Sequence, residues 1–132
     1  MISFYTDGAY SSKMQKGGWA FYCPEYHLRL CGNATNTTIN RMELLAAIKV
    51  LEFIEDANIE EKEITIFSDS MYLVGGASLG WSQAKNTDLW DQLNMLIEGM
   101  FAKKIYFKHI DGHCGIDGNE IADSLAVKLS QL

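Results

Sequence analysis

The sequence predicts an α/β fold in which a five-stranded mixed sheet, an antiparallel meander followed by parallel strands, is flanked by helices. The first third of the chain contains three short β-prone segments separated by turn residues, which is typical of an antiparallel meander. Later β-prone segments alternate with segments whose apolar residues have helical spacing, which predicts parallel strands at the centre of the sheet. The length of 132 residues fits a single domain over residues 1–132, and a hydrophobic fraction of 48% suffices for its core.

The first three β-prone segments are predicted to form the meander. Ile2–Tyr5 is apolar, and we expect this strand to end at Asp7. Gly17–Cys23 follows as the second strand, and Pro24 terminates it because proline lacks the donor that a strand ladder needs. His27–Gly32 then returns as the third strand.

The clearest helix is predicted over residues 40–55. Its apolar residues recur every three or four positions, at Leu44, Leu45, Ile48, Leu51 and Ile54. Asn40 is expected to cap this helix, because Glu43 follows three residues later as in a capping box.

The remaining elements alternate between strand and helix. We expect a strand over Glu63–Ser68, a short helix ending near Gly75, a helix over Thr87–Phe101, a last strand over Lys104–Ile110 and a final helix over Asn119–Leu132.

Four acidic residues occupy positions that this topology brings to one edge of the sheet. Asp7 and Asp69 end two strands that we expect to be neighbours, whereas Glu43 and Asp123 lie in the first turns of two helices. Each acid alone is explained as a strand-end or helix-cap residue, but clustered carboxylates repel one another unless a cation neutralises them. Their oxygens suit Mg²⁺ or Mn²⁺, and two such ions can hold the attacking and leaving oxygens of a phosphoryl transfer. The set therefore predicts two Mg²⁺ ions, for which Mn²⁺ can substitute.

Four sequence blocks surround these acids. They are Tyr5-Thr6-Asp7-Gly8-Ala9, Asn40-Arg41-Met42-Glu43-Leu44-Leu45-Ala46-Ala47, Ser68-Asp69-Ser70-Met71-Tyr72, and Gly112-His113-Cys114-Gly115 with Gly118-Asn119-Glu120-Ile121-Ala122-Asp123. In this order and spacing they resemble the motifs of type 1 ribonucleases H, and the resemblance extends from Ile2 to about Leu129. It implies a ribonuclease H-like fold and an endoribonuclease that hydrolyses the RNA strand of RNA–DNA hybrids, leaving 5′-phosphate and 3′-hydroxyl ends.

The resemblance also implies a role for each matched residue. Asp7 would bridge both metal ions, Glu43 and Asp69 would complete the ion beside the leaving 3′ oxygen, and Asp123 would hold the ion that activates water. His113 matches a loop histidine that assists proton movement or product departure. Its alternative role is that of an ordinary exposed loop residue.

Substrate contacts are expected from Gly8, Asn40, Met71 and Trp81. Asn40 matches an asparagine that contacts RNA in the minor groove, where 2′-hydroxyls distinguish RNA from DNA. Met71 stands where bacterial relatives usually have glutamine, and Ile39 replaces a usual asparagine, so these polar contacts are lost. Trp81 is expected either to stack on a deoxyribose or to lie partly buried in the core.

The segment of residues 76–86 departs from the bacterial pattern, in which an extra helix and a basic loop are common. It is short and contains only one basic residue, Lys85, as in retroviral and some archaeal forms. We therefore expect a compact form without the basic protrusion and with modest affinity for the hybrid, because phosphate neutralisation supplies much of nucleic-acid binding.

The net charge of −6 is unusual for a protein that binds nucleic acid, but it is unevenly distributed. Residues 52–63 contain six acidic residues and one lysine, which suggests a solvated helix end facing away from the substrate. The rest of the chain has 11 acidic and 10 basic residues, and four of those acids are the proposed metal ligands.

Cysteine usage and the N-terminus predict a cytoplasmic protein. The three cysteines match no zinc pattern, and Cys23 and Cys31 could form a disulfide across a hairpin, although reduced thiols are the preferred interpretation. No apolar segment has the length needed to span a bilayer, and residues 1–7 lack the pattern of a signal peptide. We expect no membrane partner and a monomer.

Two other functions stay open at this point. A DNA-cutting integrase or resolvase relative would share the fold, but residues 40–43 and 118–120 argue against it. A catalytically silent hybrid-binding module would not need all four acids. The sequence leaves open whether the protein acts alone or beside a polymerase.

Overall fold

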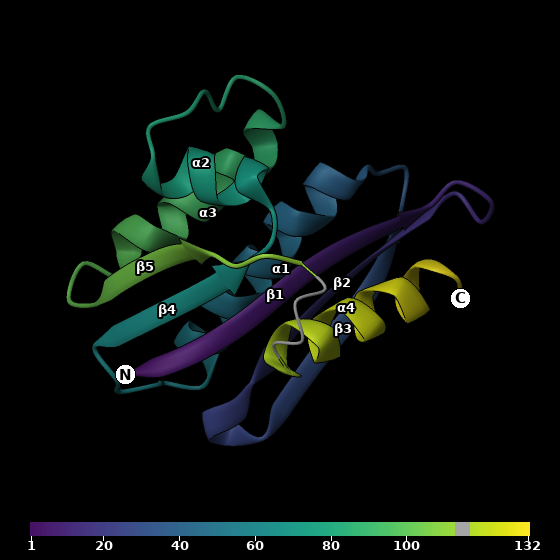
Figure 1. Cartoon of the computed structure of the whole chain (residues 1–132). Helices are drawn as coiled ribbons and strands as arrows, with labels where there is room; N and C mark the ends of the chain where they lie inside the picture. Colours follow the sequence, from purple (N-terminus) through teal and green to yellow (C-terminus); the bar gives the residue numbers. More distant parts are fainter. Residues whose placement is uncertain (113–116) are drawn as a thin grey trace.

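The computed structural model describes residues 1–112 and 117–132 and contains one five-stranded sheet with the strand order β3-β2-β1-β4-β5 (Figure 1). The strands are β1 (Ile2–Ser11), β2 (Lys16–Cys23), β3 (Leu28–Thr35), β4 (Glu63–Ser68) and β5 (Lys104–His109). β1, β2 and β3 pair antiparallel, whereas β4 is parallel to both β1 and β5. The predicted mixed sheet is confirmed.

Helices cover both faces of this sheet. They are α1 (Ile39–Asp56), α2 (Met71–Ser78), α3 (Thr87–Gly99) and α4 (Asp117–Ser130), with a 3₁₀ turn η1 at Pro24–Tyr26. In Figure 1, α4 lies in front of β2 and β3, and α1 lies behind the sheet with α3 packed against it. The hydrophobic core, to which the sheet, α1, α2 and α3 contribute, is fully buried at Phe4, Phe21, Leu44, Ile48, Leu51, Ile64, Ile66, Leu73, Trp90 and Leu93.

β1 is longer than the sequence predicts, because it has two different partners along its length. Ile2–Tyr5 pairs in parallel with β4, and from Tyr5 to Ser11 the strand pairs antiparallel with β2. The prediction that this strand ends at Asp7 is therefore wrong, since β2 supplies a backbone partner beyond the point where β4 stops. Asp7 instead lies just past the parallel pairing, in the middle of β1.

The start of α1 also differs from the prediction. Thr38, not Asn40, is the cap, and its side-chain oxygen accepts a hydrogen bond from the backbone N–H of Arg41 at 3.3 Å. The capping box expected from Asn40 and Glu43 is wrong, because the helix begins at Ile39 and Asn40 already lies within its first turn.

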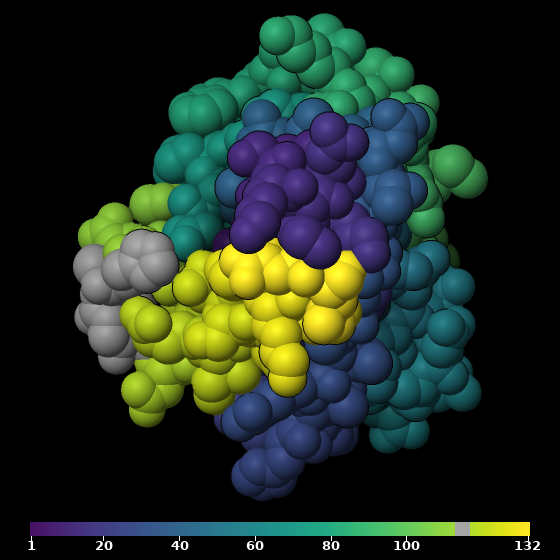
Figure 2. All heavy atoms as spheres, turned by 90° about the vertical axis from the view of Figure 1, so that its right-hand side faces the viewer, coloured from purple at the N-terminus to yellow at the C-terminus, as the bar shows by residue number. Residues whose placement is uncertain are grey.

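Other boundaries shift by a few residues. β3 continues to Thr35 because β2 supplies a partner for every residue as far as Lys16. α3 ends at Gly99, and α4 already includes Asp117 among the described residues. The end of α4 lies against the β1–β2 hairpin (Figure 2), where Lys16 Nζ donates a hydrogen bond to the Leu132 carbonyl oxygen.

The meander keeps two of its cysteines apart. The β2–β3 register pairs Cys23 with Leu28 and Cys31 with Ala20, so the two thiols do not face each other. Cys23 is buried, Cys31 is exposed and both are free, so a disulfide between them is absent. Cys114 lies outside the described residues. Across the described ranges, every helix is too short or too polar to cross a membrane.

Candidate active site

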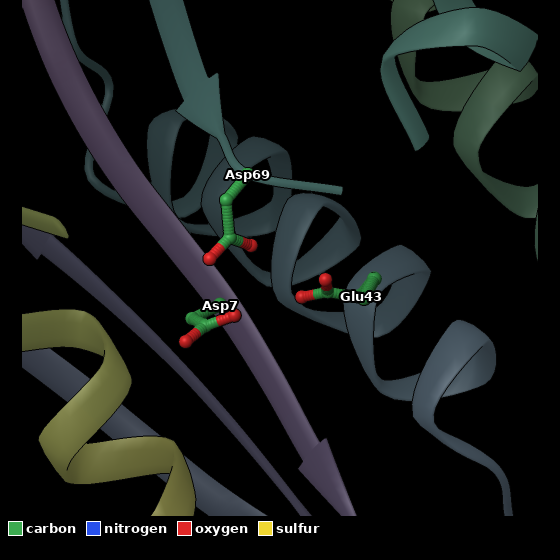
Figure 3. A group of neighbouring side chains, drawn as sticks. All are labelled: Asp7, Glu43 and Asp69. Carbon is green, nitrogen blue, oxygen red and sulfur yellow. The ribbon is translucent and has the colours of Figure 1, made fainter. Parts of the chain in front are cut away.

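Three carboxylates form a compact cluster at one edge of the sheet. Asp7, Glu43 and Asp69 each offer an oxygen, and these three oxygens all lie within 4.8 Å of one another. Figure 3 shows the three side chains pointing toward a common centre from β1, α1 and the end of β4. The prediction that these three acidic side chains lie close together is confirmed.

Asp7 and Asp69 come from neighbouring parallel strands. β1 and β4 are in register at Tyr5 and Phe67, whose rings stack with centroids 5.0 Å apart. Each aspartate lies two residues beyond its aromatic neighbour. Because the two strands run in the same direction, this equal spacing brings the carboxylates to the same level of the sheet edge.

Gly8 allows α1 to approach β1 closely enough to deliver Glu43. A Cβ at this position would lie 2.5 Å from the backbone nitrogen of Glu43 and 2.6 Å from the carbonyl carbon of Met42. The Gly8 backbone N–H also donates to Asp7 Oδ1 at 2.9 Å, which orients that carboxylate. A residue without a side chain is thus needed between the strand and the helix.

Burial and mutual repulsion dominate the electrostatics of the cluster. Asp7 is only 4% exposed, and its pKa is raised first by burial and then by the charges of Glu43, Asp69 and Asp123. The pKa of Glu43 is also raised, by burial and then by the charge of Asp69. Both shifts mean that the folded protein disfavours charge at this edge unless positive charge is supplied.

Asp123 lies on α4, beside Asp7 but outside the group of three. A side-chain hydrogen bond with Asp123 contributes to the raised pKa of Asp7, which places the two carboxyl groups in contact. The four predicted acids therefore meet at one edge, three from one side and Asp123 from α4.

The donor set fits a hard divalent cation. Among the described residues, Glu43 is only 6% exposed, and its Oε1 atom is buried without any hydrogen-bond partner. Buried carboxylate oxygens without a donor require compensation, and oxygen ligands of this kind suit Mg²⁺ or Mn²⁺.

The other predicted site residues differ in their exposure to solvent. Asn40 is half-buried in the first turn of α1, and Met71 is 37% exposed as the first residue of α2. Trp81 is 51% exposed between α2 and α3, so it is not a core residue, and its backbone N–H donates to the Gly75 carbonyl oxygen. His113 lies outside the described residues. A Cβ at Gly112, directly before it, would lie 2.8 Å from Asp69 Oδ2.

Ser70 is a residue of the site that sequence analysis missed. Its side chain caps α2 by accepting from the Leu73 N–H at 3.1 Å, and a hydrogen bond to Ser70 lowers the pKa of Glu43, against the larger effect of burial. The sequence contained a signal for the position of this side chain, because serine is a preferred N-cap residue and Ser70 directly precedes a predicted helix.

Comparison with known proteins places the chain in a family. The family model described as RNase H matches residues 1–131. Proteins named Ribonuclease H are similar to this chain: one from Rhodopirellula baltica is 34% identical over 98% of this chain and 90% of its own length. Relatives from Pseudomonas fluorescens and Ruthia magnifica are 35% and 36% identical, each over 95% of this chain and over 89% and 92% of their own lengths.

The chain therefore belongs to the ribonuclease H family, and it is a hydrolase of that family. The resemblance noted in its motifs is confirmed.

Proposed function

We propose that this protein is an endonuclease that cleaves the RNA strand of RNA–DNA hybrids with two divalent ions, leaving 5′-phosphate and 3′-hydroxyl ends. The cluster of Asp7, Glu43 and Asp69 within 4.8 Å carries this proposal. Carboxylates at this separation, two of them buried, are poorly explained by a structural role, since they lower the stability of the metal-free fold.

Asp7, Glu43, Asp69 and Asp123 would hold the ions, with Mg²⁺ as the expected metal and Mn²⁺ as a substitute. When bound, the ions supply positive charge at the attacking and leaving oxygens of the scissile phosphodiester. The chain itself keeps the ligands in place. The Gly8 N–H orients Asp7, and packing in the first two turns of α1 holds Glu43 at its position.

His113 is proposed as a proton carrier or an aid to product departure. Support comes from its neighbour Gly112, whose backbone passes close to the carboxylate of Asp69. A histidine delivered there could exchange protons near neutral pH, because its ordinary pKa is about 6.5.

Substrate binding is proposed for Asn40, Met71 and Trp81, which are partly exposed, whereas Gly8, also predicted to contact the substrate, is buried between β1 and α1. Asn40 has a partly exposed amide in the first turn of α1, three residues before Glu43, and is proposed to contact the RNA 2′-hydroxyls. Trp81 is half-exposed and offers an aromatic face for a deoxyribose. Met71 provides an apolar contact only.

Cleavage of labelled substrates tests this function directly. RNA–DNA hybrid, RNA duplex and DNA duplex are incubated with the protein, with and without Mg²⁺, and the products are sized on a gel. We expect Mg²⁺-dependent cuts in the RNA of the hybrid alone. Cleavage of the DNA duplex would instead identify a DNA-cutting relative, and hybrid binding without cleavage would identify a silent binding module.

A further inference from the structure

The short helix α2 contains two consecutive glycines, Gly75 and Gly76, in its second half. Glycine is among the least favourable residues for the interior of a helix, because it loses the most backbone freedom there. Both glycines are buried, so a tertiary contact is the expected reason for them. Two such positions in a helix of only eight residues indicate that neighbouring groups need the space that side chains would fill.

The rings of two tryptophans occupy that space. A Cβ at Gly75 would lie 2.1 Å from Trp81 Cε3 and 2.3 Å from Trp81 Cδ2, and a Cβ at Gly76 would lie 2.4 Å from Trp90 Cη2. The two rings differ in their burial, because Trp90 is 1% exposed and Trp81 is 51% exposed. Trp90 therefore belongs to the core, whereas Trp81 lies on the surface of α2 and stays open to solvent on its other side.

Hydrogen bonds hold the segment between α2 and α3, at the top of Figure 1, against α2. The backbone N–H of Trp81 donates to the Gly75 carbonyl oxygen at 3.1 Å, and Gln83 Nε2 donates to the Gly76 carbonyl oxygen at 2.9 Å. Asn94 Nδ2 on α3 in turn donates to Gln83 Oε1 at 2.8 Å. The backbone of Trp81 is thus fixed to the same residue on which its ring lies.

Met71 and Gly75 lie on the same face of α2, since residues four apart on a helix point in the same direction. Met71 is 37% exposed, and the ring of Trp81 covers Gly75. The side chains of Met71 and Trp81 therefore form one exposed apolar surface, which begins two residues after Asp69. We refer to these two side chains as the α2 strip.

We propose that Gly75 is a positioning residue for substrate binding, because it leaves room for Trp81 to lie beside Met71 in an α2 strip that contacts one strand of the nucleic acid. This inference rests on the proposed function and deepens it. Aromatic side chains form contacts with nucleic-acid strands that do not depend on sequence, and a ring already held in place loses less freedom on binding. Since Lys85 is the only basic residue between α2 and α3, a preformed apolar strip would compensate for the small number of phosphate contacts there.

Stability measurements test the packing of Trp81 on Gly75. Gly75→Ala should lower the midpoint of thermal unfolding by about 3 °C or more, because the added methyl group meets the ring of Trp81. In a protein that already carries Trp81→Ala, Gly75→Ala should not lower the midpoint, because the ring is gone and alanine favours helix. Gly99→Ala is the matched control and should not lower it either, since a Cβ there would meet nothing within 4 Å. Equal losses from Gly75→Ala with and without the ring would overturn the proposal.

Binding of a labelled RNA–DNA hybrid tests the positioning role. Fluorescence anisotropy is followed in chelator, so that no strand is cut, at a temperature at which circular dichroism shows the variants folded. We expect Gly75→Ala and Trp81→Ala each to weaken binding at least about 5-fold, and the double variant to bind like Trp81→Ala alone. Gly76→Ala, which brings a methyl group against the buried ring of Trp90, should change the affinity less than about 2-fold.

Several binding results would contradict this role. Equal weakening by Gly76→Ala would do so, because any distortion of α2 would then have the same effect. A double variant that binds more weakly than Trp81→Ala alone would show that Gly75 does not act through Trp81, and this comparison holds even if Gly75→Ala alone does not fold. Unchanged affinity of Trp81→Ala, or absence of saturable binding by the unaltered protein, would also overturn the proposal. Hybrid that is bound but not cut in Mg²⁺ would instead contradict the proposed function and leave this inference standing.

Discussion

Arg41 and Asp88 form a bidentate ion pair that joins the first turn of α1 to the first turn of α3. Arg41 Nη1 lies 2.9 Å from Asp88 Oδ1, and Nη2 lies 2.7 Å from Oδ2. Arg41 also donates to the side-chain oxygen of Asn86, directly before α3, at 3.3 Å. The pair therefore ties the helix that carries Glu43 to the segment that follows Trp81.

Asp88→Asn should weaken this connection without unfolding the protein, because exposed ion pairs contribute little to stability. Hydrogen bonding with Arg41 lowers the pKa of Asp88 to about 2. The pKa of Asp88 in the folded protein lies below its ordinary value of 3.8. The contribution of the ion pair to folding stability is therefore present above pH 3.8 and is lost as the pH falls toward 2. An NMR titration of the Asp88 carboxyl carbon checks the shift. A midpoint at the ordinary value would mean that the pair does not persist in solution.

Asp7→Asn should stabilise the metal-free protein at neutral pH. The folded pKa of Asp7 is raised, so above the ordinary value of 3.8 the unfolded chain releases a proton that the folded chain retains. Stability therefore falls as pH rises from about 4 toward neutrality, and the variant removes this loss. Thermal unfolding in chelator at about pH 5 and about pH 8 should show a gain in the melting temperature that is small at the lower pH and reaches about 3 °C or more at the higher pH. Asp91→Asn, at an exposed position on α3, is the control and should leave both transitions unchanged.

Asp69→Asn should abolish most cleavage while keeping the fold. The amide keeps the shape of the side chain but lacks the charge of a metal ligand, and a missing catalytic group usually lowers the rate about 100-fold or more. Hybrid cleavage in Mg²⁺, with circular dichroism as a check on folding, measures this. Near wild-type activity would contradict the assignment of Asp69 to the metal site.

Gly8→Ala should reduce both stability and activity. The added methyl group meets the backbone of Met42 and Glu43, which cannot move aside like a flexible side chain, so we expect a loss of about 1–3 kcal/mol. Gly99→Ala is the matched control, because a Cβ there would meet nothing within 4 Å and alanine favours helix. Urea unfolding of both variants gives the comparison. Equal stability of the two would show that β1 and α1 can separate at no cost.

Sequence patterns predicted the fold and the carboxylate cluster because both depend on long, regular signals. The helical spacing around Ile48 and the alternation of later strands and helices determine the topology. Asp7 and Asp69 were placed together by the parallel strands that precede them. Local periodicity was sufficient for these features.

Features that depend on tertiary partners could not be predicted in the same way. The end of β1 is set by β2, which continues the ladder past Asp7, and the cap of α1 is set by the extended backbone at Thr38. The ion pair of Arg41 with Asp88 depends on how α3 packs against α1, and the half-exposed position of Trp81 depends on its contact with Gly75 of α2. A single sequence contains no local signal for such contacts.

The carboxylates that meet at the edge of the sheet are widely separated along the chain. Asp7 belongs to β1, Glu43 to α1, Asp69 follows β4, and Asp123 lies in α4. Since α4 packs on β1 and β2, a proteolytic fragment that ends before α4 would keep Asp7, Glu43 and Asp69 but lose Asp123.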